Sequence, residues 1–136
     1  FGRLPLALSA RCFTARAHHL PKDECEFRCR DYPDGLPLAT REGQRFLTIN
    51  GIQTQSCRTS GLVAGLPELR AIGVDVLRLS PQAHGMHDIV QVFREALEGR
   101  LAPAAAEARL TVHMPDGACN GYWRGEPGMG WQPHAG

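Results

Sequence analysis

Three cysteines lie within eighteen residues near the start of this 136-residue chain, and they constrain its chemistry more than any other feature. Cys12, Cys25 and Cys29 form a C-x12-C-x3-C array. A disulfide would use two of these thiols and strand the third, whereas thiolates beside cationic side chains bind iron or zinc. Such cations surround the array, at Arg11, Arg16, Lys22, Arg28 and Arg30. The spacing therefore indicates a soft-metal site with three of its four ligands in one segment.

Charge and cysteine usage limit the class of protein. The net charge of +1 and the pI near 7.9 do not provide the basic surface that phosphate tracking needs, which argues against nucleic acid as a partner. No apolar run approaches the roughly 20 residues of a membrane helix. Five cysteines, an odd number, do not pair off into a disulfide framework. We therefore expect a cytoplasmic protein without a membrane span.

Apolar periodicity predicts a parallel α/β architecture. Residues 4–9 and 74–79 have the composition of strands, and residues 59–72 and 86–98 have the spacing of helices, the second ending at Gly99. A strand, helix, strand, helix order is typical of parallel sheets. The run Leu4–Ser9 is apolar on both faces and would need neighbours on each side, and the chain begins with Phe1. We therefore expect the C-terminal part of a larger protein.

Two further regions complete the expected organisation. Residues 36–40 and 45–49 read as a β-hairpin around the polar sequence 41–44. Residues 1–100 are expected to form one incomplete domain, with a long cysteine-bearing loop at 10–35. Residues 101–136 are expected to be a C-terminal extension that is mostly loop, with a short helix at 103–109.

The cysteine array stands within a longer pattern of residues. Its segments are Gly2–Arg16, Pro21–Cys25 with Cys29, Leu47–Thr54, Val76–Gln82 and Cys119–Trp123. Together they resemble the UbiV branch of the U32 peptidase family, over almost the whole chain. The resemblance implies a (β/α) barrel-type fold, a [4Fe-4S] cluster, and a heterodimer with a UbiU-like sister protein.

The resemblance also implies a function and a set of ligands. Members of this branch take part in the O2-independent hydroxylation of the ring in ubiquinone biosynthesis, so a ubiquinone precursor is the implied substrate; delivery by a lipid-carrier protein stays open. Cys12, Cys25 and Cys29 match three cluster ligands, and the fourth is expected from the N-terminal half of the larger protein. No nucleophile, base and orienting residue stand at a recognisable spacing, so peptidase activity is not expected. Catalytic residues are not identified.

Alternatives to this interpretation remain open. A zinc site completed by His18 or His19 would use the same three thiols, and a zinc-stabilised, non-catalytic binding module would follow from it. Three unrelated thiols are a simpler alternative. An RNA-modifying hydroxylase of the same broad family is a further alternative. Cys57 is either a free thiol or a surrogate ligand, whereas Cys119, beside Tyr122 and Trp123, is expected to be buried.

Polar residues near expected strand ends are weaker candidates for a site. His84 and His87 follow the expected strand at 74–79, and solvated positions at a helix start explain them better than catalysis does. Asn50, Gln53 and Ser80 lie at similar expected strand ends, where they could hydrogen-bond a substrate. Turn chemistry explains Asn50 before Gly51 equally well.

Overall fold

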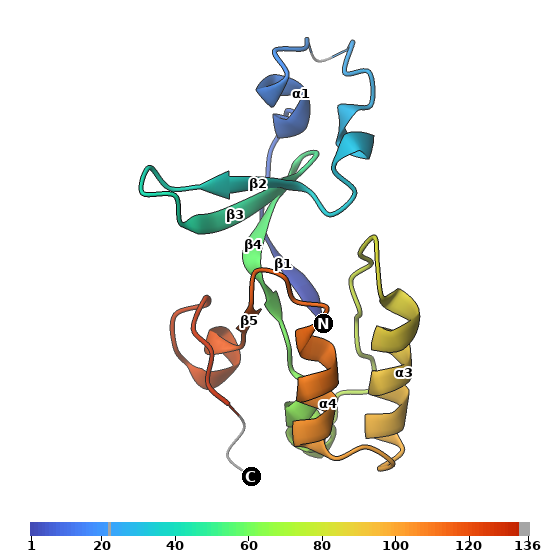
Figure 1. Cartoon of the computed structure of the whole chain (residues 1–136). Helices are drawn as coiled ribbons and strands as arrows, with labels where there is room; N and C mark the ends of the chain where they lie inside the picture. Colours follow the sequence, from blue (N-terminus) through green and yellow to red (C-terminus); the bar gives the residue numbers. More distant parts are fainter. Residues whose placement is uncertain (22, 134–136) are drawn as a thin grey trace. The chain divides into compact units, whose positions relative to one another are not determined.

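The computed structural model describes residues 1–21 and 23–133, and the chain divides into two compact units. The cysteine unit is Arg3–Cys57, and the helical unit combines Phe1–Gly2 with Arg58–Gly136. Strands β1 (Gly2–Leu8) and β4 (Gln53–Ser60) have residues in both units (Figure 1).

The sheet is open and mainly antiparallel, so the expected parallel (β/α) barrel-type fold is wrong. Its strands follow the order β1-β4-β3-β2, and β5 (Ala118–Cys119) pairs with β4. β2 (Leu36–Ala39) pairs antiparallel with β3 (Arg45–Asn50), and β3 pairs antiparallel with β4. The short β4–β5 contact is a parallel pair. Tight turns instead of crossover helices join β2, β3 and β4, and tight turns produce antiparallel neighbours.

The predicted hairpin at residues 36–40 and 45–49 is confirmed by β2 and β3. Gly43 adopts a φ of +83° in the turn, a conformation that glycine reaches without a steric penalty. Its amide donates a hydrogen bond to the carbonyl oxygen of Thr40 over 3.0 Å. The turn sequence therefore sets the register of this pair.

β4 begins at Gln53, soon after the Asn50-Gly51 pair. Asn50 pairs with Gln53 across a second tight turn, in which Gly51 has a φ of +61°. An Asn-Gly pair is a strong hairpin signal because both residues tolerate positive φ. The expected helix at 59–72 is wrong in its first part, since β4 continues through Ser60. The helical turns that follow are η2 (Val63–Gly65) and α2 (Leu66–Ala71).

Residues 74–79 do not form the expected strand. The Phe1 ammonium donates to the carbonyl oxygen of Arg78 over 2.9 Å, and the Ser80 amide donates to the Phe1 carbonyl oxygen over 2.8 Å. These two hydrogen bonds follow the pattern of a parallel strand pair, but they involve a single residue, Phe1, of the opposing segment. Val76 is 82% exposed. A composition typical of strands was therefore not enough for residues 74–79 to form one.

Helices α3 (Met86–Leu97) and α4 (Pro103–Thr111) lie side by side in the helical unit (Figure 1). Both predicted helices are confirmed, and Gly99, with a φ of +72°, follows the end of α3. Their buried faces meet each other. The core of this unit consists of Val63, Leu66, Ile89, Val92, Phe93, Ala106, Leu110 and Met114.

Helix α4 and the turn after it contribute to this core. Ala106 and Leu110 are fully buried, and Met114 is nearly so. The elements after α4 are β5 and η3 (Gly121–Arg124), while α1 (Phe13–Ala17) and η1 (Arg28–Asp31) lie in the cysteine unit. Among the described residues, none of the helices combines the length and the apolar character needed to cross a membrane.

Candidate metal centre

Cys12 lies at the start of α1, whose position is set by the β3–β4 turn. Its Sγ accepts a hydrogen bond from the Ala15 amide over 3.4 Å, and its side chain is half-buried. Thr14 is buried behind it, where its hydroxyl oxygen accepts a hydrogen bond from the Gly51 amide over 3.3 Å. The Phe13 amide donates in turn to the Gly51 carbonyl oxygen over 2.9 Å. The sheet therefore fixes the position of Cys12.

Cys25 and Cys29 lie on a segment with little burial and a strained backbone. Cys25 is half-buried and Cys29, within η1, is exposed. The Cys29 thiol donates to the carbonyl oxygen of Phe27 over 3.8 Å. Glu26 and Phe27 have φ values of +51° and +52°, a region that costs a non-glycine residue about 1–3 kcal/mol. Such strain is typical of segments that bind a ligand.

A side-chain contact joins the first half of the cysteine segment, residues 10–35, to the last part of the same segment. The His18 Nε2 atom and the Tyr32 hydroxyl are 3.1 Å apart, and the ring centroids are 5.7 Å apart. These residues follow α1 and η1, which are themselves in contact. The helix that begins after Cys12 and the turn that carries Cys29 are thus neighbours. His18 already uses its Nε2 atom, which makes it a less available zinc ligand, while His19 is exposed.

The three thiols share this segment without forming a ligand group. In the described ranges, 1–21 and 23–133, no set of three or more His, Cys, Asp or Glu residues is arranged to hold a metal ion. The donor chemistry suits a soft metal, because thiolates are soft ligands. None of the three thiols is fully buried. The arrangement of the segment does not fit a cluster as it stands. Binding at Cys12, Cys25 and Cys29 would therefore require the segment to rearrange.

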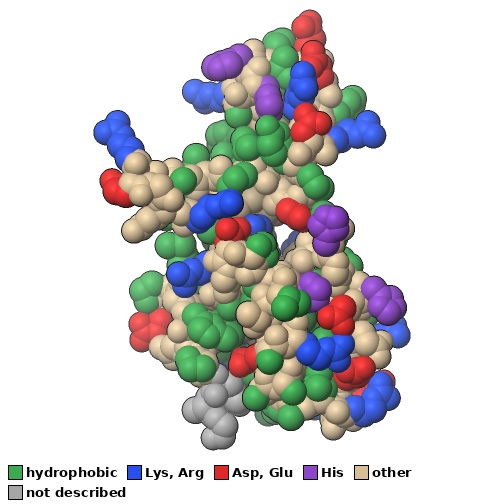
Figure 2. Space-filling model, viewed as in Figure 1, with side chains coloured by type: hydrophobic (Ala, Val, Ile, Leu, Met, Phe, Trp, Pro, Cys, Tyr) green, Lys and Arg blue, Asp and Glu red, His purple; other side chains and the backbone are tan. Residues whose placement is uncertain are grey.

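The cations around the array are distributed rather than focused on the thiols. Arg28 pairs with Glu26 over 3.0 Å and with Asp31 over 3.6 Å. Arg11 donates to the Leu20 carbonyl oxygen over 3.3 Å, and Lys22 lies outside the described residues. On the face that Figure 2 shows, Lys and Arg side chains are interspersed with acidic ones instead of forming one continuous patch.

Cys57 and Cys119 differ from the other three cysteines in burial. Their exposed fractions are 2% and 1%, and they lie on β4 and β5. The prediction that Cys119 is buried is confirmed. Burial of the Cys57 side chain in a strand argues against its use as a surrogate ligand for Cys12, Cys25 and Cys29.

The weaker candidates near strand ends do not converge on a site. Asn50 is exposed and serves the β3–β4 turn, and Gln53 accepts a hydrogen bond from Gln55 over 2.9 Å. Ser80 lies against Gly2, where an added Cβ would approach the Ser80 Cβ to 2.5 Å. His84 and His87 are exposed at the start of α3.

An ionic cluster between α3 and α4 was not predicted from the sequence. Asp88 accepts hydrogen bonds from His113 Nε2 over 2.9 Å and from Arg109 Nη2 over 2.5 Å. The His113 hydrogen bond, followed by that of Arg109, holds the pKa of Asp88 below its usual value. Arg109 also donates to Glu95 over 2.7 Å, and a hydrogen bond from Gln91 is the first cause of the lowered pKa of Glu95.

The spacing of these residues in the sequence could predict only the pairs that are four residues apart. Gln91 and Glu95 are four residues apart on α3, as are Arg109 and His113 around the end of α4, so each pair lies along one face of the chain. The pairing between the helices depends on tertiary packing that no local pattern shows. The cluster ties α3 to α4 and has a structural explanation.

Comparisons with known proteins do not place this chain in a family. A search against models of protein families finds no match, and no solved structure matches the chain.

Proposed function

We propose that this chain is an iron-sulfur protein that holds a [4Fe-4S] cluster through Cys12, Cys25 and Cys29. The proposal continues the resemblance to the UbiV branch: a cytoplasmic subunit of an O2-independent hydroxylase of ubiquinone biosynthesis, working with a UbiU-like partner on a ubiquinone precursor. The fourth ligand is a residue other than these three. A cluster of this kind would supply one-electron transfer with little change of its own structure.

The observation that carries the proposal is the division of the five cysteines by burial. Cys57 and Cys119 are buried in strands, as apolar residues would be. Cys12, Cys25 and Cys29 are accessible and lie within one segment. Cysteines that served only packing would be expected in the core. Their exposure therefore favours a role in binding over a role in stability.

Backbone strain in the same segment supports a ligand-dependent conformation. Within the described residues, the non-glycine residues with positive φ are His19, Glu26 and Phe27, all between Cys12 and Cys29. A segment with unfavourable backbone angles and little burial gains from any ligand that cross-links it. The residues of the chain then have a defined role: three thiolates bind, while the β3–β4 turn positions the first of them.

Anaerobic reconstitution with iron and sulfide tests this proposal. We expect a brown protein with broad visible absorption, and iron and sulfide at about four of each per chain when a small external thiol stands in for the fourth ligand. Cys12→Ser, Cys25→Ser and Cys29→Ser should each reduce the iron content sharply. Matched controls, Cys57→Ala and Cys119→Ala, should leave it unchanged.

Two outcomes would contradict the assignment. Stoichiometric zinc in a colourless protein, bound in preference to iron, would favour a zinc-stabilised module. Full iron content in the Cys12, Cys25 and Cys29 variants would show that the cluster, if bound, is held elsewhere. A cluster-loaded protein that binds RNA but no quinone precursor would instead favour the RNA-modifying branch of the family.

A further inference from the structure

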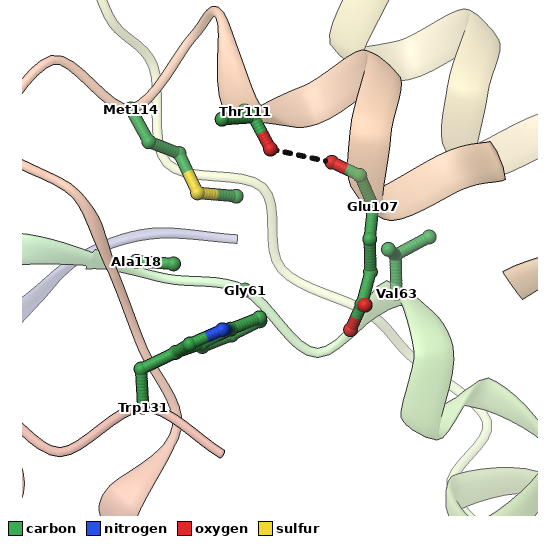
Figure 3. Close-up of a pocket in the computed structure, with 7 residues that line it drawn as sticks. All are labelled: Gly61, Val63, Glu107, Thr111, Met114, Ala118 and Trp131. Carbon is green, nitrogen blue, oxygen red and sulfur yellow. Dashed lines mark hydrogen bonds between the residues drawn. The ribbon is translucent and has the colours of Figure 1, made fainter. Parts of the chain in front are cut away.

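A small pocket in the helical unit brings a carboxylate and an indole ring together. Its walls come from the end of β4, from α4 and the turn after it, and from the C-terminal region, through Gly61, Val63, Glu107, Thr111, Met114 and Trp131. Figure 3 shows the Glu107 side chain descending from α4 towards the ring of Trp131. The pocket holds about 20 Å³ of free volume, and its lining is mostly apolar.

Glu107, on α4, differs from the two acidic residues of α3 that face α4. Asp88 and Glu95 are both paired with Arg109. Within residues 1–21 and 23–133, the half-buried Glu107 carboxylate has no ion pair and accepts no hydrogen bond from a protein group. Thr111, the other polar side chain of the pocket, donates its hydroxyl to the Glu107 backbone carbonyl over 2.9 Å (Figure 3). The carboxylate therefore presents its charge to the pocket.

The lining selects for a small organic cation. The Glu107 carboxylate attracts positive charge, and the apolar lining that includes Trp131 suits an alkyl stem. No Lys or Arg is among the residues that line the described pocket. A single carboxylate does not supply the six or more oxygen ligands that calcium takes. The volume is that of about one water-sized group, which an ammonium head fills.

We propose that this pocket binds a primary alkylammonium group, with its head at Glu107 and its apolar stem against Trp131. The head donates a charge-assisted hydrogen bond to the carboxylate. Gly61 keeps the floor open, since an added Cβ would lie 2.9 Å from Met114 Cε and 4.0 Å from Trp131 Cζ3. A lysine side chain of a partner protein and a free aliphatic amine share this chemistry.

Titration of the whole chain with n-butylammonium chloride, followed by the indole N–H resonances in NMR, tests the proposal. The chain has two tryptophans, and Trp123 already donates its indole N–H to Glu68 over 3.3 Å. We expect a saturable shift of the Trp131 resonance and little change for Trp123. Glu107→Gln should weaken binding about tenfold or more, the loss of one charge-assisted contact. Glu126→Gln, which removes an exposed carboxylate of equal charge, should leave affinity unchanged.

Two further amines distinguish the possible sources of the ligand. A separate set of results would contradict the site. Nα-acetyl-lysine methylamide and 1,5-diaminopentane represent a protein side chain and a free amine, and the tighter of the two identifies the source. Gly61→Ala should weaken both by narrowing the pocket. The site is overturned if neither amine gives a saturable shift, if n-butanol gives the same shift, or if Glu107→Gln binds as tightly as the natural chain.

Discussion

The two units of this chain differ in what holds them together. In the helical unit, Ile89, Val92, Ala106 and Leu110 have no exposed area, and they form one core between α3 and α4. In the cysteine unit, all described residues from 23 to 31 are exposed except the half-buried Cys25. The first region is stabilised by its own buried surface, whereas the second has polar contacts and strained backbone angles.

This difference separates a scaffold from a candidate binding segment. Buried apolar contacts determine a single packed arrangement, because any change leaves a cavity or a clash. A segment with few buried contacts opens at low free-energy cost. The helical unit has a core of its own, and the proposed cluster would give the cysteine segment the cross-links that burial does not supply.

The largest expected effect is a difference in the free energy of unfolding when one phenylalanine in each unit is replaced. Phe93 is 5% exposed and its ring lies 6.1 Å from that of Phe1, whereas Phe27 is 69% exposed. Phe93→Asp should lower the free energy of unfolding by about 3 kcal/mol or more, because it buries a charge. Phe27→Asp should change it by less than about 0.5 kcal/mol, since the site is solvated and Asp tolerates a positive φ. Urea denaturation measures both; equal effects would remove the distinction between the units.

A smaller effect is expected at a buried hydrogen bond that anchors the cysteine segment. Thr14 is 1% exposed, and its hydroxyl oxygen accepts from the Gly51 amide. Thr14→Ala should destabilise the cysteine unit by about 1–2 kcal/mol, because an amide loses its partner. Thr14→Ser keeps the hydroxyl and serves as the control. Chemical denaturation followed by NMR signals of this unit would show the loss; equal stability of the Ala and Ser variants would contradict it.

The smallest effect concerns pH and the ionic cluster of the helical unit. The pKa of Asp88 lies below its usual value, so between that value and the lowered pKa the unfolded chain binds the proton more readily. The stabilisation that Asp88 contributes is complete above pH 3.8, the usual pKa of Asp, and is lost as the pH falls through the lowered pKa. Asp88→Asn should flatten this acid limb of stability against pH. Asp75→Asn, at an exposed position, is the control, and an identical slope in both variants would show that the cluster contributes nothing.

Local patterns predicted those elements that depend on neighbours in the sequence. The amphipathic spacing from Met86 onward predicted α3, and the polar turn at 41–44 predicted the β2–β3 hairpin. Pairing over long distances was not predicted. The composition of 74–79 suited a central strand, yet its backbone bonds to Phe1 at Arg78 and to Leu69 at Val74, and the segment is not a strand. The barrel expected from the resemblance failed for the same reason, since strand order depends on contacts far apart in the chain.

The candidate sites show the same limit. Cys12, Cys25 and Cys29 could be selected from their spacing, because they lie close together in the sequence. The pocket formed by Glu107 and Trp131 could not, since twenty-three residues separate positions that only the packing of α4 brings together. Burial of Cys57 in β4 was also unpredictable without the second hairpin turn.

Hydrogen exchange before and after anaerobic cluster reconstitution tests the central claim most directly. Amides between residues 10 and 35 should exchange more slowly in the loaded protein, because the cluster would cross-link a segment with little burial of its own. Amides of α3 and α4 should be unchanged, and a Cys12→Ser, Cys25→Ser, Cys29→Ser triple variant should show no slowing. Unchanged exchange at 10–35 in a loaded chain, or slowing that persists in the triple variant, would contradict the assignment of these thiols.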